Sequence, residues 1–262
     1  MREIQFPHEQ RDFHFMFSHK LSVLVWAFGL MVFVLTGFVY AQMPGLLGRT
    51  LPEMYGKFRV EKVGTYAEYS LVFKQSQNEE KLKFSMVGEE ATPQGKLYWY
   101  EMRSYNRNSA ETNIVKMLIS GDPKEKGNIK RMIIKHNQEK ALELPAEVLS
   151  VGDVQGLAKG EVQKGLKDTT EVKKEQKVKE LAKEKVKTAA GVFECVHLRY
   201  EESPKDTVNA WTSEQVPIFG LVKFESKDKR LELTSYGKDA VSAITEKPEQ
   251  LRLPKDVQGS GK

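Results

Sequence analysis

Residues 97–136 read LYWYEMRSYNRNSAETNIVKMLISGDPKEKGNIKRMIIKH and contain three runs of aromatic and β-branched residues. Such residues favour strands, and the intervening residues 106–108 and 121–123 carry the Asn, Gly and Pro that are typical of turns. Because no helical repeat separates the runs, successive strands are expected to pair antiparallel. This stretch therefore predicts an antiparallel meander and not an α/β fold.

The same pattern continues in both directions along the chain, which predicts a mainly β protein built on a curved antiparallel sheet or half-barrel. Within residues 128–136, Ile129 and Ile133 share one face of a strand while Met132 and Ile134 share the other, so both faces of the sheet carry apolar residues. Strands are expected at residues 64–73, 81–87, 97–105, 113–120, 128–136, 192–201, 207–213, 220–226 and 231–236.

Two segments depart from this pattern. Residues 153–188 are rich in Lys and Glu, contain no Pro, and place apolar residues at loosely helical spacing, most regularly over 169–187. We expect a helical insertion there that contributes little to the core. Near the end of the chain, Gly237 and Asp239 can close the last strand and cap a short C-terminal helix over residues 240–245.

The N-terminal region contains an uncharged stretch over residues 21–40, with its densest apolar part at 23–35. This length suits a signal peptide, and Val39, Tyr40 and Ala41 predict cleavage after Ala41. An uncleaved inner-membrane anchor is the alternative, because about 20 apolar residues can span a bilayer; a buried core helix is a third. The first two place the rest of the chain in the periplasm or another extracytoplasmic space.

These observations divide the chain into four parts. Residues 1–41 form the signal peptide or membrane anchor, 42–57 a linker, 58–245 the β domain with its insertion at 153–188, and 246–262 a C-terminal tail.

Composition and motifs argue against several classes of function. The net charge of +5 is spread along the chain without a dense basic block, so we expect no nucleic-acid partner. Cys195 is the single cysteine and lies two residues before His197. A catalytic Cys and His normally come from separate elements with a third orienting group, so a packed thiol is favoured over a nucleophile. No metal-binding, nucleotide-binding or hydrolase motif occurs. We expect a protein that is not an enzyme, with no cofactor and no metal site.

The apolar residues are more informative. Several strands carry aromatic or Met side chains on both faces, which indicates either plain core packing or a sheet curved around an apolar cavity lined by adaptable side chains. The residues expected to line such a cavity are Tyr98, Tyr100, Met102, Met117, Met132, Trp211 and Phe224.

The order of these segments resembles a known family. LYWYEMRSY, NIVKMLISG and IKRMIIKHN are followed by FECVHLRY, TVNAWTSEQVPIFGLVKFES and LELTSYGKDAVSAI, an order similar to that of the periplasmic lipoprotein-sorting (LolA/LppX-like) superfamily. The resemblance covers residues 58–245 and implies a half-barrel with helices closing its concave side over a cavity for acyl chains. Its hairpin motif falls on Trp211, Ser213, Val216, Pro217, Gly220, Leu221, Val222 and Lys223.

These inferences lead to one main functional hypothesis, a periplasmic carrier or sensor that binds a lipid or acylated ligand. The alternative is a structural or protein-interaction module held near the membrane, with the Lys/Glu-rich segment as the contact surface for a membrane or envelope-protein partner. A third hypothesis is an enzyme with a site that no motif marks.

Overall fold

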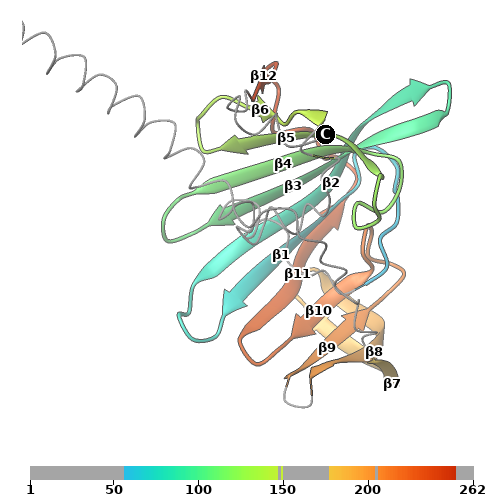
Figure 1. Cartoon of the computed structure of the whole chain (residues 1–262). Helices are drawn as coiled ribbons and strands as arrows, with labels where there is room; N and C mark the ends of the chain where they lie inside the picture. Colours follow the sequence, from blue (N-terminus) through green and yellow to red (C-terminus); the bar gives the residue numbers. More distant parts are fainter. Residues whose placement is uncertain (1–55, 147–148, 150–176, 204–205, 252–262) are drawn as a thin grey trace, which may run out of the picture.

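A computed structural model describes residues 56–146, 149, 177–203 and 206–251 of the 262-residue chain. Within these residues twelve strands form one curved, open sheet in the order β12-β6-β5-β4-β3-β2-β1-β11-β10-β9-β8-β7 (Figure 1). The strands are β1 (Tyr66–Phe73), β2 (Glu79–Thr92), β3 (Gly95–Asn106), β4 (Thr112–Ile119), β5 (Ile129–His136), β6 (Leu142–Glu143), β7 (Lys177–Thr188), β8 (Gly191–Ser203), β9 (Asp206–Thr212), β10 (Leu221–Glu225), β11 (Lys229–Gly237) and β12 (Glu249–Gln250).

The predicted meander over residues 97–136 is confirmed as the consecutive hairpins of β3, β4 and β5. The other predicted strands are also present, as β1, β2, β8, β9, β10 and β11. All neighbouring strands pair antiparallel except β12 and β6, which pair in parallel. The mainly β, curved-sheet prediction is therefore correct.

The centre of the sheet is a seam between two parts of the sequence that lie far apart. On one side β1 pairs with β2, the next strand along the chain, and on the other it pairs with β11. The register places Tyr69 beside both Leu82 and Leu233. The seam joins the β1–β6 half of the sheet to the β7–β11 half, and Figure 1 shows the two halves meeting at this line.

The helix predicted over residues 169–187 is wrong from residue 177 onward, because that segment forms the edge strand β7 and pairs with β8. Two of its apolar residues are exposed, Val178 at 50% and Leu181 at 43%, and Val186 is partly buried against the core. An edge strand needs no continuous apolar face, and lysines are common on edges because they discourage pairing with other chains. The same Lys/Glu composition that suggested a helix thus suits a solvated edge. The rest of the predicted insertion, residues 153–176, lies outside the described residues.

The short helix predicted over residues 240–245 is also wrong. Residues 240–246, here called the C-terminal strap, are not helical and cross one face of the sheet. The buried carboxylate of Glu101 accepts hydrogen bonds from Ser242 Oγ (2.7 Å) and from the backbone N–H of Ala243 (3.0 Å). These bonds satisfy polar groups that a helical turn would otherwise pair internally. Beyond the strap, residues 249–250 form β12, so part of the predicted tail belongs to the sheet.

The signal peptide or anchor predicted at residues 1–41 and most of the linker at 42–57 lie outside the described residues. Among the residues that the structure describes, no helix has the length and apolar character needed to cross a membrane.

Apolar residues are buried on both faces of the sheet, as the sequence predicts. The larger cluster extends over one face, here called the concave face, and includes Phe84, Tyr100 and Leu231. The smaller cluster lies on the opposite face beneath the C-terminal strap and contains Ile114, Ile133, Ala141 and Ile244, with Trp99 packed against it.

Candidate apolar ligand site

A row of large side chains crosses the concave face from β2 to β5. The strand register pairs Met86 with Tyr100, Tyr100 with Met117, and Met117 with Met132, and all four are fully buried. Side chains directly opposite one another on adjacent strands are in contact distance, so these residues form a continuous row. Methionine side chains are flexible and polarisable, which lets such a row adapt to different shapes.

A second row runs beside the first. Phe84, Met102, Val115 and Ile134 follow one another across β2, β3, β4 and β5, and each is at most 4% exposed. Together the two rows form a wide apolar surface, here called the Met-aromatic surface. Phe84 and Tyr100 stack with their rings nearly parallel at 6.4 Å, so the two rows are packed together.

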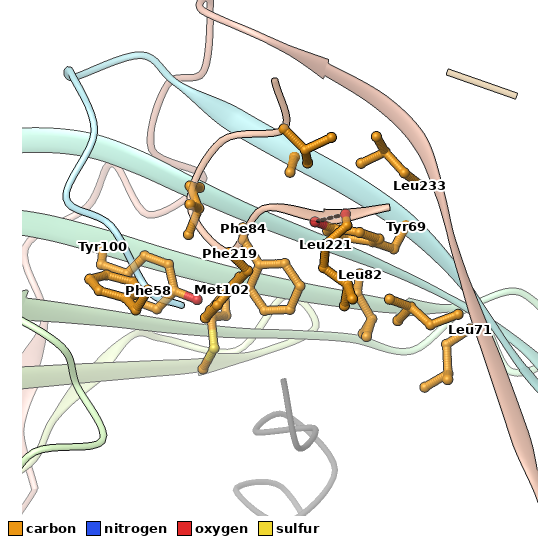
Figure 2. Packing of buried hydrophobic residues seen from close by; sticks show 14 of the residues in the cluster. Phe58, Tyr69, Leu71, Leu82, Phe84, Tyr100, Met102, Phe219, Leu221 and Leu233 are labelled. Carbon is orange, nitrogen blue, oxygen red and sulfur yellow. Dashed lines mark hydrogen bonds between the residues drawn. The ribbon is translucent and has the colours of Figure 1, made fainter. Parts of the chain in front are cut away.

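Two short segments cover the Met-aromatic surface, residues 56–59 before β1 and the loop of residues 213–220 between β9 and β10; together they are called the cover. The ring of Phe58 lies 5.3 Å from that of Tyr100, and the ring of Phe219 lies 5.3 Å from that of Phe84. Phe58 and Phe219 also contact one another at 5.5 Å (Figure 2). The cover therefore supplies the aromatic groups that close the concave face.

The cover is held in a strained conformation. Ile218 is fully buried and has a φ of 70°, a value that β-branched residues adopt only rarely and at a cost. Arg59 fastens the loop, because its backbone N–H donates to the carbonyl of Ile218 (2.7 Å) and its guanidinium to the carbonyl of Val216 (2.5 Å). Gly56 lies so close that an added Cβ would be 2.3 Å from the Phe219 carbonyl oxygen.

The hydroxyl of Tyr100 is the unusual polar group of this face. It is fully buried and has no hydrogen-bond partner among the described residues. Burial raises the pKa of Tyr100 well above its usual value, so the hydroxyl keeps its proton and can donate. The second buried tyrosine, Tyr69, differs in this respect, because its hydroxyl donates to the Leu221 carbonyl oxygen (3.0 Å; Figure 2).

Five of the seven predicted lining residues lie in the buried cluster of the concave face, namely Tyr100, Met102, Met117, Met132 and Phe224. Tyr98 is partly buried against the same cluster, on β3 opposite Ile119. Phe224 lies on β10, across the seam from the Met-aromatic surface, and pairs with Leu231.

Trp211 is also partly buried against the cluster of the concave face, and it has polar contacts as well. Its ring stacks on that of His197 at 4.5 Å, its indole N–H donates to Glu184, and Lys223 Nζ lies 5.2 Å from the ring centroid. These contacts tie β7, β8, β9 and β10 together.

Cys195 and His197 do not form a catalytic pair in this arrangement. The thiol of Cys195 is buried and lies 3.7 Å from the Phe193 carbonyl oxygen, while His197 contacts Glu184 and Asn209. Burial raises the pKa of Cys195 to about 11, which disfavours the thiolate that a nucleophile needs. In the described part of the chain, no group of three His, Cys, Asp or Glu residues is placed to hold a metal ion.

Sequence reasoning does not find the cover. Phe58 directly follows the predicted linker and precedes the first strand, and Phe219 lies in the predicted hairpin motif without a role of its own. The available signal is the run of Val216, Pro217, Ile218 and Phe219, which is too apolar for an exposed turn.

No family model and no curated protein matches the sequence. Among solved structures, a Bacteroides fragilis protein with a YmcC-like fold, described as exported, is 11% identical; it has a TM-score of 0.34 over 70% of this chain and 100% of its own. A Parabacteroides distasonis protein described as a lipoprotein is 12% identical, with a TM-score of 0.33 over 70% and 99% of the two chains. MucB in complex with MucA(peri) is 10% identical, with a TM-score of 0.33 over 68% and 51%. At these scores the similarity is weak and assigns no activity, ligand or partner to this chain.

Proposed function

We propose that this protein is an exported, non-enzymatic carrier or sensor that binds an acyl chain or similar apolar group on the Met-aromatic surface, beneath the cover. The observation that carries the proposal is the buried Tyr100 hydroxyl, which lies unpaired among the described residues in the middle of an apolar face. A buried donor without a partner costs about 1–3 kcal/mol, so such groups are rare outside functional sites. A ligand with an acyl chain and a carboxyl or ester oxygen would supply both apolar contact and the missing acceptor.

The energetics of such a ligand are favourable. Burying about 12 methylene groups would contribute roughly 10 kcal/mol before the costs of association. Part of this gain would be spent on moving Phe58 and Phe219 away from Tyr100 and Phe84. The strain at Ile218 lowers that cost, because a loop that leaves an unfavourable backbone conformation recovers of order 1–3 kcal/mol.

The export part of the proposal rests on the uncharged residues 21–40 and the cleavage pattern that ends at Ala41. The buried, protonated thiol of Cys195 supports a protein without a thiol nucleophile.

The test is saturable uptake of a fluorescent fatty acid, cis-parinaric acid, by the full-length protein, together with native mass spectrometry for lipid that co-purifies with it. We expect Met117→Glu to abolish uptake because it places a charge in the fully buried row. Tyr105→Glu is the matched control, since this side chain is exposed on β3 and the same charge is added. Far-UV circular dichroism shows whether each variant keeps its β structure.

A milder variant keeps the test informative if Met117→Glu does not fold. Tyr100→Phe removes only the hydroxyl, so cis-parinaric acid should bind about fivefold more weakly while the neutral probe N-phenyl-1-naphthylamine binds as before. The proposal fails if the wild-type protein takes up neither probe saturably and carries no lipid in native mass spectra.

A further inference from the structure

The outer side of the edge strand β7 has backbone N–H and C=O groups that pair with no other strand of the described residues. It is the last strand of the sheet, and no strand among the described residues pairs with its outer side, although β7 also approaches β11 and its Val186 packs against the core. A backbone in this position has N–H and C=O groups that point away from the sheet and can pair with an added strand. A bulge between Glu180 and Lys183 interrupts the strand, so the regular part of this edge is residues 183–188.

Lysines occupy one face of this regular part. Lys183, Lys185 and Lys187 alternate along β7, so they point to the same side about 7 Å apart. All three are exposed, and none forms an ion pair with a described residue. The strand's acidic residue in this part, Glu184, points to the other side, where it is held by His197 and Trp211. On β7 itself this face carries positive charge only, and on the neighbouring strand the exposed Glu194 lies opposite Lys185.

This charge determines which strand can be added. A second copy of β7 paired antiparallel would place lysines opposite lysines, and like charges directly opposite one another are destabilising. An extended segment with an acidic residue at every second position would place a carboxylate opposite each lysine. The lysines thus act against self-association and in favour of one class of partner.

We propose that residues 183–188 of β7 form a docking edge for an extended acidic peptide segment of another protein, which adds to the sheet as a further strand. Backbone hydrogen bonds supply affinity, and Lys183, Lys185 and Lys187 supply selectivity and register. This inference does not depend on the apolar ligand site, because β7 lies at the end of the sheet opposite to β3–β5.

The test uses fluorescence anisotropy of the full-length protein with a labelled short peptide that has Glu at alternate positions and Thr or Val between them. The charge-reversed variant K183E/K185E/K187E should bind at least about tenfold more weakly, whereas the matched control K62E/K126E/K227E, which reverses three exposed lysines elsewhere, should bind as the wild type does. Uptake of cis-parinaric acid should be the same in all three proteins, which separates this result from failure of the carrier hypothesis.

Two further probes distinguish strand addition from simple attraction between charges. The same peptide with N-methyl groups at alternate backbone nitrogens keeps its charge but loses ladder donors, and it should bind at least about tenfold more weakly. Equal binding of the methylated peptide would overturn the proposal and leave only a charged patch. Lysine-dependent binding to vesicles of phosphatidylglycerol and phosphatidylcholine, without binding of the peptide, would overturn it in favour of a membrane-contact surface.

Discussion

Two buried tyrosines in one cluster show how much a single hydrogen bond matters at the scale of a residue. Tyr69 and Tyr100 are both fully buried on the concave face, and burial raises the pKa of each. The hydroxyl of Tyr69 has a partner, the Leu221 carbonyl oxygen, and that of Tyr100 has none among the described residues. Removing these two hydroxyls should therefore have opposite effects on stability.

We expect Tyr100→Phe to raise the free energy of unfolding by about 1 kcal/mol, since it removes a buried donor without a partner. Tyr69→Phe should lower the free energy of unfolding by about 1 kcal/mol, because it leaves the Leu221 carbonyl unpaired. Urea denaturation followed by fluorescence measures both values. Equal destabilisation by the two substitutions would mean that Tyr100 has an acceptor in the folded protein.

At the scale of the element, the C-terminal strap shows how an irregular segment is fixed. It packs Ile244 into the smaller cluster and donates two hydrogen bonds to Glu101, and Lys116 Nζ donates to Ser242 Oγ (2.9 Å). Glu101 is only 4% exposed, so its carboxylate depends on these donors. One acidic side chain on β3 thereby anchors a segment that lies about 140 residues later in the chain.

Glu101→Ala should release the strap at a cost of about 2 kcal/mol, because the Ser242 and Ala243 donors lose a charged acceptor. Limited trypsin digestion detects the release as faster cleavage after Lys238, since the bond after Lys247 precedes Pro248 and resists trypsin. Glu194→Ala is the control, since Glu194 is exposed on β8 and far from the strap in the sheet order. Cleavage at the wild-type rate in Glu101→Ala would show that Ile244 alone holds the strap.

The strands could be predicted where alternation and turn residues agree, as in β3, β4 and β5. The prediction of secondary structure failed where the amino-acid composition of a segment does not reveal its position in the sheet. In β7, the residues Lys183, Lys185 and Lys187 look the same on a helix surface as on an exposed edge, because neither environment requires a continuous apolar face. The helix prediction for the strap failed for another reason. The conformation of the strap depends on its contact with Glu101, which is too far away in the sequence for the local residue pattern to reveal.

At the scale of the whole molecule, the seam between β1 and β11 should control local stability. Amides of β1, β2 and β11 bond on both sides within the sheet, whereas β7 has a described partner on one side only. Hydrogen exchange at the seam therefore requires opening of much of the sheet, and exchange in β7 requires only local fraying.

We expect hydrogen-exchange mass spectrometry to find the slowest exchange in peptides that cover β1 and β11, and exchange at least about 100-fold faster in peptides that cover β7. Peptides from β4 serve as an internal reference, because this strand is also flanked on both sides. Exchange in β1 as fast as in β7 would mean that the two halves of the sheet separate without global unfolding.

In the candidate site, too, the residues on regular strands could be predicted, and the contacts between distant segments could not. Tyr100, Met102, Met117 and Met132 could be placed on a shared face because each lies on a regular strand with a clear alternation. The cover could not be predicted, since Phe58 and Phe219 come together from segments about 160 residues apart. That the Tyr100 hydroxyl has no partner in the described part of the chain is a property of the assembled packing and leaves no trace in the sequence.

The seam also sets the order in which the molecule can form. Hairpins such as β2–β3 and β4–β5 close short loops and can form within microseconds. The second partner of β1, however, is β11, which lies about 160 residues later in the chain, so that side of β1 stays unpaired until β11 has been made. Closing such a long loop is slow. A ribosome or translocon that delivers this chain from its N-terminus therefore exposes a half-built sheet edge, and the newly made chain has to be kept from aggregating until its last strands arrive.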